Sequence, residues 1–332
     1  YSDDTFDFND QLYMPVYHEL DAWKYEWIFV DEAQDISPIQ LLLIKKFISP
    51  RTRLIFVGDR NQAIYAFRGA DENSMDNIKS GFKCQEFPLS ISYRCPNKVI
   101  ALLKEINTEV DGKPDNKDGD VIASSSIDRI IQSKDSLVLC RTNAPLVQLS
   151  IEMVAKGHKV CIPNDDYRIK LVTELKGLGK MPIDEIVDKY HEIYMYWKEQ
   201  ARENKSYRWK EAEQRDIFQV FKCLRFLCDN GTQLKNKIED IFQKKEDALQ
   251  FLTVHKAKGL EAKDVFIVNP QLFDKFKKTS QNKEDSTQYQ QETNIKYVAL
   301  SRSMENLHYI YVNMGDEKEE SDKDNYEFIE KM

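Results

Sequence analysis

WIFVDEAQD at residues 27–35 and VGDRNQAIYAFRGAD at residues 57–71 are the two stretches that decide the fold of this chain. The first stretch opens with a short apolar run at residues 27–30, and the second begins at the last residue of another such run, 54–57. Both stretches continue into acidic and turn-forming residues. Short apolar runs bounded in this way predict two buried strands of a parallel sheet. Because α/β proteins bind ligands beyond the carboxyl ends of such strands, we expect Asp31 and Glu32 to lie at a ligand-binding edge.

The chemistry of these two stretches indicates a nucleotide site. Asp31 is expected to hold Mg²⁺, and Glu32 to orient or deprotonate an attacking water. An Asp-Glu pair alone is weak evidence, because acidic residues commonly open the loop or helix after a strand. The second stretch adds Gln62 as a candidate sensor of a γ-phosphate. Side chains that could stack on bases and contact phosphates follow it: Tyr65, Phe67 and Arg68.

Apolar strand-like runs alternate with helical patterns along the chain, which predicts an α/β fold with a mostly parallel sheet. The expected strands are 27–30, 54–57, 137–140, 160–162, 265–268 and 307–312. Residues 38–48 are expected to form a helix with Ser37 as its cap, which gives a right-handed crossover between the first two strands. Between residues 165 and 248 the composition changes to long charged and aromatic helices. Their aromatic stripe is more typical of a helix core than of a base-stacking surface: Tyr190, Tyr194, Tyr196 and Trp197.

Composition narrows the class of protein. The chain has 332 residues, is 41% hydrophobic and carries a net charge of −8, which argues against bulk electrostatic coating of nucleic acid. Its longest apolar runs are too short to cross a bilayer and no signal peptide opens the sequence, so we expect an intracellular, cytoplasmic protein without a membrane segment. The six cysteines lack the spacing of a zinc site, which predicts reduced thiols.

The two deciding stretches resemble the second and third motifs of the UvrD/Rep/PcrA-like helicases of superfamily 1. Further stretches are similar to motifs of that family in the same order: FDFND (6–10), ISYRCP (91–96), LTVHKAKGLE (252–261) and YVALSRS (297–303). The resemblance covers most of the chain and implies parts of two RecA-like parallel-sheet domains. It places the first in residues 1–88, the second in 89–164 and 251–332, and a helical accessory insertion in 165–250.

The resemblance also implies roles for residues in the later motifs. Tyr93 would stack on the adenine of ATP, and Glu261 would contact the nucleotide. Arg94 and Arg302 would reach the γ-phosphate when the domains close, which couples hydrolysis to motion. Thr253 and His255 would face single-stranded DNA. For each arginine alone a surface salt bridge is the competing interpretation, and for His255 it is a structural core histidine.

The chain departs from the family pattern in packing positions and in one large respect. The packing departures are Ser92, Ala262, Ser301 and Ser303, and none of them removes a charge that the mechanism needs. The large departure is that no GxxxxGK[ST] sequence is present, so the phosphates of ATP lack their main anchor. We therefore expect a P-loop upstream, with this chain as the carboxy-terminal part of a longer protein; a degenerate relative that does not use ATP is the rival explanation.

Two functions from different classes follow. The first is an ATP-dependent DNA helicase or translocase that uses ATP and Mg²⁺ and moves, by resemblance, 3′ to 5′ on single-stranded DNA, with contact to a duplex junction as an option. This chain alone would then be inactive. The second is a catalytically inactive helicase-like DNA-binding or scaffold module. The joint presence of Asp31, Glu32, Gln62, Arg94 and Arg302 favours the first, because a scaffold does not need that set.

Overall fold

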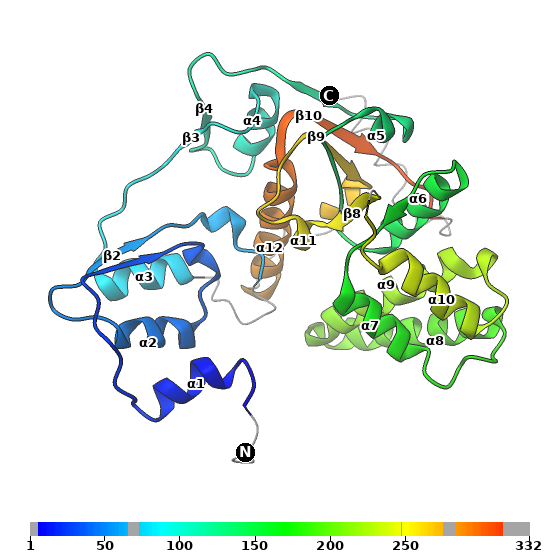
Figure 1. The fold of residues 1–332 in the computed structure, drawn as a ribbon, viewed down its shortest axis with the longest axis horizontal. Coiled ribbons are helices and arrows are strands. Elements are labelled where there is room, and N and C mark those ends of the chain that lie inside the picture. Colours follow the sequence, from blue (N-terminus) through cyan, green and yellow to red (C-terminus); the bar gives the residue numbers. More distant parts are fainter. Residues whose placement is uncertain (1–5, 66–72, 247, 275–282, 315–332) are drawn as a thin grey trace. The chain divides into compact units, whose positions relative to one another are not determined.

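The computed structural model describes residues 6–65, 73–246, 248–274 and 283–314. The chain divides into two compact units, one formed by Tyr1–Ser90 with Phe276–Val298 and the other by Ile91–Lys275 with Ala299–Met332. Figure 1 shows the ribbon coloured along the sequence; the first unit contains the blue elements, cyan α3 and most of the orange-brown α12, and the second contains the rest.

Two parallel strands form the sheet of the first unit. β1 (Trp27–Val30) pairs in register with β2 (Arg53–Phe56), and α2 (Pro38–Lys46) makes the connection between them. α1 (Asp10–Tyr17), α3 (Ser74–Phe82) and most of α12 (Lys283–Leu300) also belong to this unit. The predicted strands and the helix between them are therefore confirmed.

The start of α2 is determined locally by its sequence. The Ser37 hydroxyl accepts from the backbone N–H of Gln40, and the Gln40 side chain accepts from the backbone N–H of Ser37, 2.8 Å away. Pro38 occupies the first turn, where its missing N–H breaks no helical hydrogen bond. This reciprocal pair is a capping box, so the prediction of Ser37 as the cap is correct.

The prediction that β1 and β2 are buried is wrong for one face of this sheet. Trp27, Phe29, Ile55 and Val57 are 47%, 69%, 38% and 49% exposed. The other face packs through Val30 and Phe56 against a small core made by Ala33, Ile36 and Ile78. The apolar runs contain enough hydrophobic surface for two covered faces, but the described elements of this unit cover one.

Six parallel strands form the sheet of the second unit. Their spatial order is β5 (Asp120–Ile122), β10 (Ser303–Ile310), β9 (Ala262–Val268), β6 (Ser136–Cys140), β8 (Leu249–Thr253) and β7 (Val160–Cys161). A separate pair joins β3 (Ile91–Ser92) to β4 (Asp111–Gly112). The predicted strands 137–140, 160–162, 265–268 and 307–312 correspond to β6, β7, β9 and β10. The sequence patterns missed β5 and β8, because the first is three residues long and the second, LQFLT, has neither a continuous apolar run nor a regular alternation.

Helices surround this sheet. Those close to it in sequence are α4 (Asn97–Lys104), α5 (Asp128–Gln132), α6 (Ala144–Ala155) and α11 (Val254–Ala257). Between β7 and β8 the chain forms α7 (Asp165–Glu174), α8 (Ile183–Glu203), α9 (Arg208–Leu224) and α10 (Gly231–Phe242), drawn in green to yellow-green in Figure 1. A continuous buried cluster runs from sheet residues such as Val138 and Phe266 to helix residues such as Phe221 and Ile238. The helical segment is thus packed into the core of this unit.

The fold is therefore of the predicted α/β class, with parallel sheets of the kind found in RecA-like domains. Among the described residues, no helix combines the length and apolar character that a membrane crossing requires. The domain boundaries expected from the sequence stay predictions.

Candidate nucleotide and nucleic-acid sites

The loops that follow β1 and β2 lie at the same edge of their parallel sheet. Val57 N–H donates to Val30 O at 2.8 Å, and Ala33 N–H donates to Val57 O at 2.9 Å. Asp31 and Glu32 follow the first strand, and Gly58 and Asp59 follow the second. The structure thus brings the acidic pair to the carboxyl edge of the sheet, where ligands of α/β proteins bind, together with residues 58–65, called the sensor loop after the predicted role of Gln62.

The backbone at the acidic pair is held in an unusual conformation. Glu32 has φ 50° and ψ 40°, in the left-handed region that non-glycine residues rarely adopt. Asp31 Oδ1 accepts the Glu32 N–H at 2.9 Å, and both residues are exposed. Such a turn exposes two neighbouring carboxylates instead of burying them in a continuing helix. Strain of this kind persists where the surrounding structure holds it in place.

Gln34 supplies that surrounding structure. Its side chain is 2% exposed, its Nε2 donates to Glu32 Oε2 at 2.5 Å, and its Oε1 accepts the Asp59 N–H at 3.0 Å. Gly58 leaves room for it, since a Cβ at this position would lie 2.6 Å from Gln34 Oε1. One buried amide therefore joins the two loops and fixes the carboxylate of Glu32.

Gln62 lies in a 3-10 turn, η2 (Arg60–Gln62), that is held from within and from α12. Gln62 Nε2 donates to Asp59 Oδ2 at 2.9 Å, and Asp59 Oδ1 accepts the Asn61 N–H at 2.9 Å. From α12, the buried Asn294 donates to Arg60 O at 3.1 Å and to Ala63 O at 2.9 Å. These hydrogen bonds hold the Gln62 amide against the Asp59 carboxylate and attach the turn to α12.

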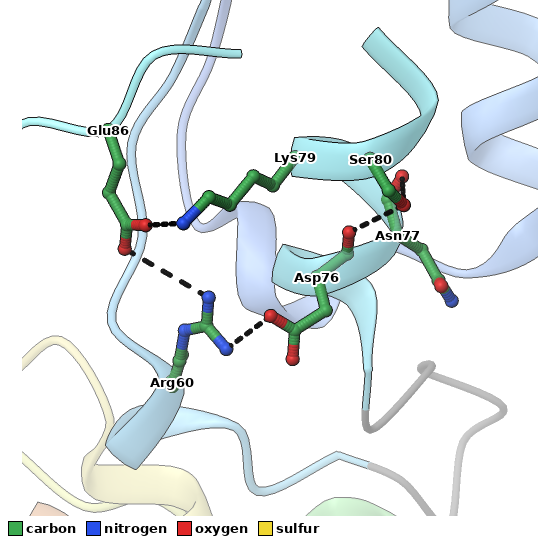
Figure 2. Close-up of polar contacts among 6 residues, drawn as sticks. All are labelled: Arg60, Asp76, Asn77, Lys79, Ser80 and Glu86. Carbon is green, nitrogen blue, oxygen red and sulfur yellow. Dashed lines mark hydrogen bonds and ion pairs between the residues drawn. The ribbon is translucent and has the colours of Figure 1, made fainter. Parts of the chain in front are cut away.

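A surface ion-pair network fixes the other side of this turn. Figure 2 shows Arg60 between two carboxylates, with Nη1 at 2.6 Å from Asp76 Oδ1 and Nη2 at 4.0 Å from Glu86 Oε1. Lys79 Nζ lies 2.5 Å from Glu86 Oε2. The hydrogen bond and charge of Lys79 lower the pKa of Glu86 below its ordinary value. All four side chains are about half-exposed, so the network orients the turn and adds little to stability.

The donor set at this edge suits Mg²⁺ in the presence of a nucleotide. Asp31 and Glu32 supply carboxylate oxygens, and Mg²⁺ commonly binds through one or two carboxylates together with substrate phosphates. Within the described ranges, no group of three or more His, Cys, Asp or Glu forms a complete metal cage. The acidic pair thus fits a Mg²⁺ ion that arrives with phosphates.

The predicted nucleic-acid residues of the first unit are only partly described. Tyr65 is half-buried at the end of the sensor loop. Phe67 and Arg68 lie outside the described residues, so their predicted roles stay predictions.

In the second unit three of the predicted nucleotide residues cluster at the amino ends of β9 and β10. Arg94 Nε lies 2.5 Å from Glu261 Oε2, although the N–H is not directed along a hydrogen bond. Arg302 donates from Nη1 to Leu260 O at 3.3 Å and from Nη2 to Ser301 Oγ at 2.9 Å. One loop, at residues 260 and 261, therefore contacts both arginines.

The two arginines differ in access. The Arg94 side chain is 37% exposed, whereas Arg302 as a residue is 2% exposed. Nearby, Cys95 Sγ contacts Ser301 O at 3.5 Å, and burial raises the pKa of this thiol. Tyr93, the predicted adenine-stacking residue, is 78% exposed. The surface-salt-bridge interpretation holds for the geometry of Arg94, but not for the buried Arg302.

Thr253 and His255 lie at the opposite ends of the strands of the same sheet, near the carboxyl ends. Thr253 ends β8 in register with Cys140, which pairs with Val268 at the carboxyl end of β9. Glu261 precedes the amino end of β9, so the two edges are separated by roughly 20 Å along the strand. Thr253 is 9% exposed and His255 is half-buried at the start of α11. The predicted nucleotide and nucleic-acid residues of this unit thus form two separate groups.

Sequence reasoning did not single out Gln34 or Asn294, although both are buried polar residues that hold the site. Gln34 lies inside the first deciding stretch, between Glu32 and Asp35. Asn294 stands in a mostly polar run, QQETN at residues 290–294, so the sequence carried no signal that its side chain is buried. Buried amides in such positions need hydrogen-bond partners, and here the partners are loop carbonyls.

The parallel sheets place the chain in the α/β class, with candidate nucleotide-site residues in the carboxylates at a strand end and in the arginines of the second unit. Comparison with known proteins narrows this class. Residues 8–83 match the UvrD/REP helicase N-terminal domain, and residues 185–314 match the UvrD-like helicase C-terminal domain. This chain belongs to the UvrD/Rep-like helicases of superfamily 1, as its motifs predicted.

Individual relatives agree with this assignment. The chain is 24% identical to a probable DNA helicase II homolog of Mycoplasma pneumoniae, over 87% of this chain and 54% of the relative. It is 26% identical to F-box DNA helicase protein 1 of Schizosaccharomyces pombe, over 86% of this chain and 34% of that protein. A shorter match, 30% identical over 30% of this chain and 16% of the relative, is to ATP-dependent DNA helicase Rep of Buchnera aphidicola. The chain thus spans about half the length of its Mycoplasma relative and a smaller share of the other two relatives.

Proposed function

We propose that this chain is part of an ATP-dependent DNA helicase or translocase. In this proposal it contributes the Mg²⁺ carboxylates, the γ-phosphate sensor and the arginines of the motor. An upstream region of the same polypeptide contributes the P-loop. Single-stranded DNA is the proposed track, and 3′ to 5′ is the proposed direction.

The observation that carries the proposal is the Gln34 bridge between the two loops. It joins the carboxylate of Glu32 to the backbone of Asp59, whose side chain in turn accepts from Gln62. A group that activates water and a group that senses the terminal phosphate must keep a constant separation through the reaction. A structural sheet edge has no need of this arrangement, because exposed carboxylates are stable in water without a partner.

The pairing of Arg94 with Glu261 supports the same function. Phosphate oxygens bind a guanidinium with the same two-pronged geometry as a carboxylate does. A half-exposed Arg94 beside Glu261 can therefore exchange that carboxylate for a phosphoryl group. When ATP and Mg²⁺ are bound, they supply the phosphoryl group whose charge the arginine neutralises.

The test is ATP hydrolysis stimulated by single-stranded DNA, measured on a longer polypeptide that contains this chain and a P-loop. We expect stimulated turnover that falls by about 10²- to 10⁴-fold in Glu32→Gln, the range for removal of a general base. Nucleotide binding should be retained in this variant, because the amide keeps the size of the side chain. Equal turnover in the two proteins would refute the role of Glu32.

Direction and track need a separate measurement. Duplexes with either a 3′ or a 5′ single-stranded tail, in DNA and in RNA, would be offered to the same polypeptide. The proposal expects unwinding of the 3′-tailed DNA. Preference for a 5′ tail would reject the direction, and preference for RNA would reject the track, while the motor itself would stand.

The burial of Arg302 favours one alternative, a helicase-like DNA-binding scaffold. Arg302 is 2% exposed, and it donates to Leu260 O and to Ser301 Oγ of the same chain. An arginine kept in this state during a full cycle would not reach a nucleotide. A folded, DNA-binding polypeptide that shows no turnover would support this alternative.

A further inference from the structure

The connection between α8 and α9 carries an unusual concentration of aromatic and basic side chains. Residues 196–210 read YWKEQARENKSYRWK. They include five basic and two acidic residues, a local charge of +3 in a chain whose net charge is −8. Four aromatic residues are interleaved with the basic ones: Tyr196, Trp197, Tyr207 and Trp209. We call residues 196–210 the hairpin tip.

The body of the hairpin explains why the tip is a separate feature. Tyr190 packs edge-on against Phe221 at 4.8 Å, and Tyr194 stacks on Phe218 at 5.9 Å. These pairs run in opposite sequence directions, so α8 and α9 are antiparallel and their middle is closed by its own aromatics. Tyr190 is 2% exposed, so the core prediction for the stripe is correct at this residue.

The tip does not follow this pattern, because its aromatic rings remain accessible. Trp209 is 64% exposed, Tyr196 57% and Tyr207 38%. Trp197 packs between two of them, with ring centroids 5.3 Å from Tyr196 and 5.6 Å from Tyr207. The rings thus hold one another in place while leaving surface for a partner. For Tyr196, the prediction of a core role is wrong.

Cations accompany these rings. Lys210 Nζ lies 5.8 Å from the ring of Trp197 and 5.3 Å from that of Trp209, and Lys198 Nζ lies 5.5 Å from the ring of Tyr194. Lys210 also lies 3.4 Å from Glu213, but that carboxylate is shared with Lys170. Lys210 therefore lies beside both tryptophan rings and shares its carboxylate partner with a second lysine.

From these observations we propose that the hairpin tip is a binding site for single-stranded nucleic acid. Exposed aromatic rings offer faces on which bases stack, and adjacent lysines and arginines contact the phosphates between them. An acidic protein would use the charges but would have little use for the exposed indole faces. This site goes beyond the proposed motor, because it uses none of the residues assigned to ATP or to the track at Thr253 and His255.

The chain contains four tryptophans, and two of them are in the tip, which permits a direct test. In the full chain, Trp23→Phe with Trp27→Phe leaves Trp197 and Trp209 as the only tryptophans. Titration of this protein with oligo(dT) should quench its tryptophan fluorescence to saturation. Trp209→Ala in the same background should weaken binding by roughly 5- to 100-fold, from the contribution of one base–aromatic stack.

Charge and specificity controls complete the experiment. Lys205→Gln should reduce the salt dependence of binding by about 0.7 in log–log slope, as expected for loss of one phosphate contact on a single strand. Phe226→Ala is the aromatic control, since Phe226 is 89% exposed in the same helical segment and its neighbour Arg225 is paired with Asp184. Lys235→Gln, beside Glu239, is the charge control. Both controls should bind like the parent.

The outcomes separate this inference from the motor proposal. No quenching by oligo(dT), or equal quenching by poly-glutamate, would overturn a base-stacking site at the tip. DNA-stimulated hydrolysis by the longer polypeptide, together with no quenching of the tip tryptophans by oligo(dT), would overturn this inference alone. Saturable quenching, together with no ATP hydrolysis by the longer polypeptide that contains a P-loop, would support the tip and refute the motor.

Discussion

Gln34 shows how one buried side chain can organise residues from two separate stretches of sequence. Its amide meets the carboxylate of Glu32 and the backbone of Asp59, and Gly58 provides the space that it occupies. A buried amide of this kind is stable only if its donors and acceptors are satisfied together. The position of Glu32 is therefore a consequence of packing around Gln34, as well as of its own backbone.

Gln34→Ala tests this dependence. The change removes the side chain that accepts from the Asp59 N–H and donates to the Glu32 carboxylate, so we expect a loss of about 1–3 kcal/mol in the free energy of unfolding of the first unit. Hydrogen exchange at the amides of residues 31–35 and 58–62 would measure it. Gln148→Ala, at a side chain with one 3.5 Å contact, is the control. Unchanged exchange near Asp59 would contradict the bridging role.

His308 is a second residue whose environment can be tested, through pH. It is 5% exposed, its Nδ1 lies 2.8 Å from Ser125 Oγ, and its ring stacks on Phe266 at 4.4 Å. Desolvation lowers the pKa of His308 below 6.5, opposed by the nearby carboxylates of Asp264 and Asp120 and assisted by Arg129. The neutral ring is therefore the form that the folded protein prefers.

The sign of the pH effect follows from linkage. Below pH 6.5 the unfolded chain takes up a proton at His308 before the folded chain does, so stability falls as pH falls. Above that pH the contribution is fully present. We expect His308→Gln to flatten the acid side of a stability profile of this chain, recorded by thermal melting between pH 5 and 8. A profile that keeps its slope in the variant would show that another group is responsible.

At the scale of elements, the sequence patterns predicted those whose determinants are local. α2 begins at Pro38 because Ser37 and Gln40 cap each other, a feature contained in four consecutive residues. β5 and β8 have no such local signal and form because neighbouring strands complete their hydrogen bonds. Element prediction therefore succeeded where short-range contacts decide and failed where long-range pairing does.

Ser37→Ala tests the local origin of α2. Loss of the cap should reduce helix stability by about 1 kcal/mol, because the N–H of Gln40 loses its side-chain acceptor. Faster hydrogen exchange in the first turn of α2 would report the change, with Ser80→Ala as the control at a hydroxyl that accepts no cap hydrogen bond. Retention of the same exchange rates would mean that packing, not capping, sets the start of the helix.

At the scale of the whole molecule, the two units differ in how completely they are covered. The second has a six-stranded sheet with a large buried cluster, whereas the first has a two-stranded sheet with one apolar face exposed. Two strands alone are marginally stable, and contiguous exposed apolar surface commonly marks an interaction site. This exposed face supports the proposal that a region carrying the P-loop packs on the first unit.

Phe29→Ser distinguishes a covered face from a free one. In this chain alone, where Phe29 is 69% exposed, we expect a change in unfolding free energy within about 0.5 kcal/mol. In the longer polypeptide the same change should destabilise by about 1–3 kcal/mol, because a hydroxyl would be buried against apolar neighbours. Chemical denaturation of both proteins would give the two values. Leu89→Ser, at a residue 91% exposed, is the control, and equal effects of Phe29→Ser in both proteins would reject the covered face.

The amino-acid sequence by itself determined the family, the α/β class and the order of the motifs, because these depend on residue types and spacing along the chain. It also determined local structure such as the Ser37 cap. Only the tertiary structure decided that Gln34 and Asn294 hold the sensor loop, that Arg302 is buried, and that Tyr196 and Trp209 are exposed while Tyr190 is not. Burial and hydrogen-bond partners depend on residues far apart in sequence that packing brings together, and no pattern in one stretch contains that information.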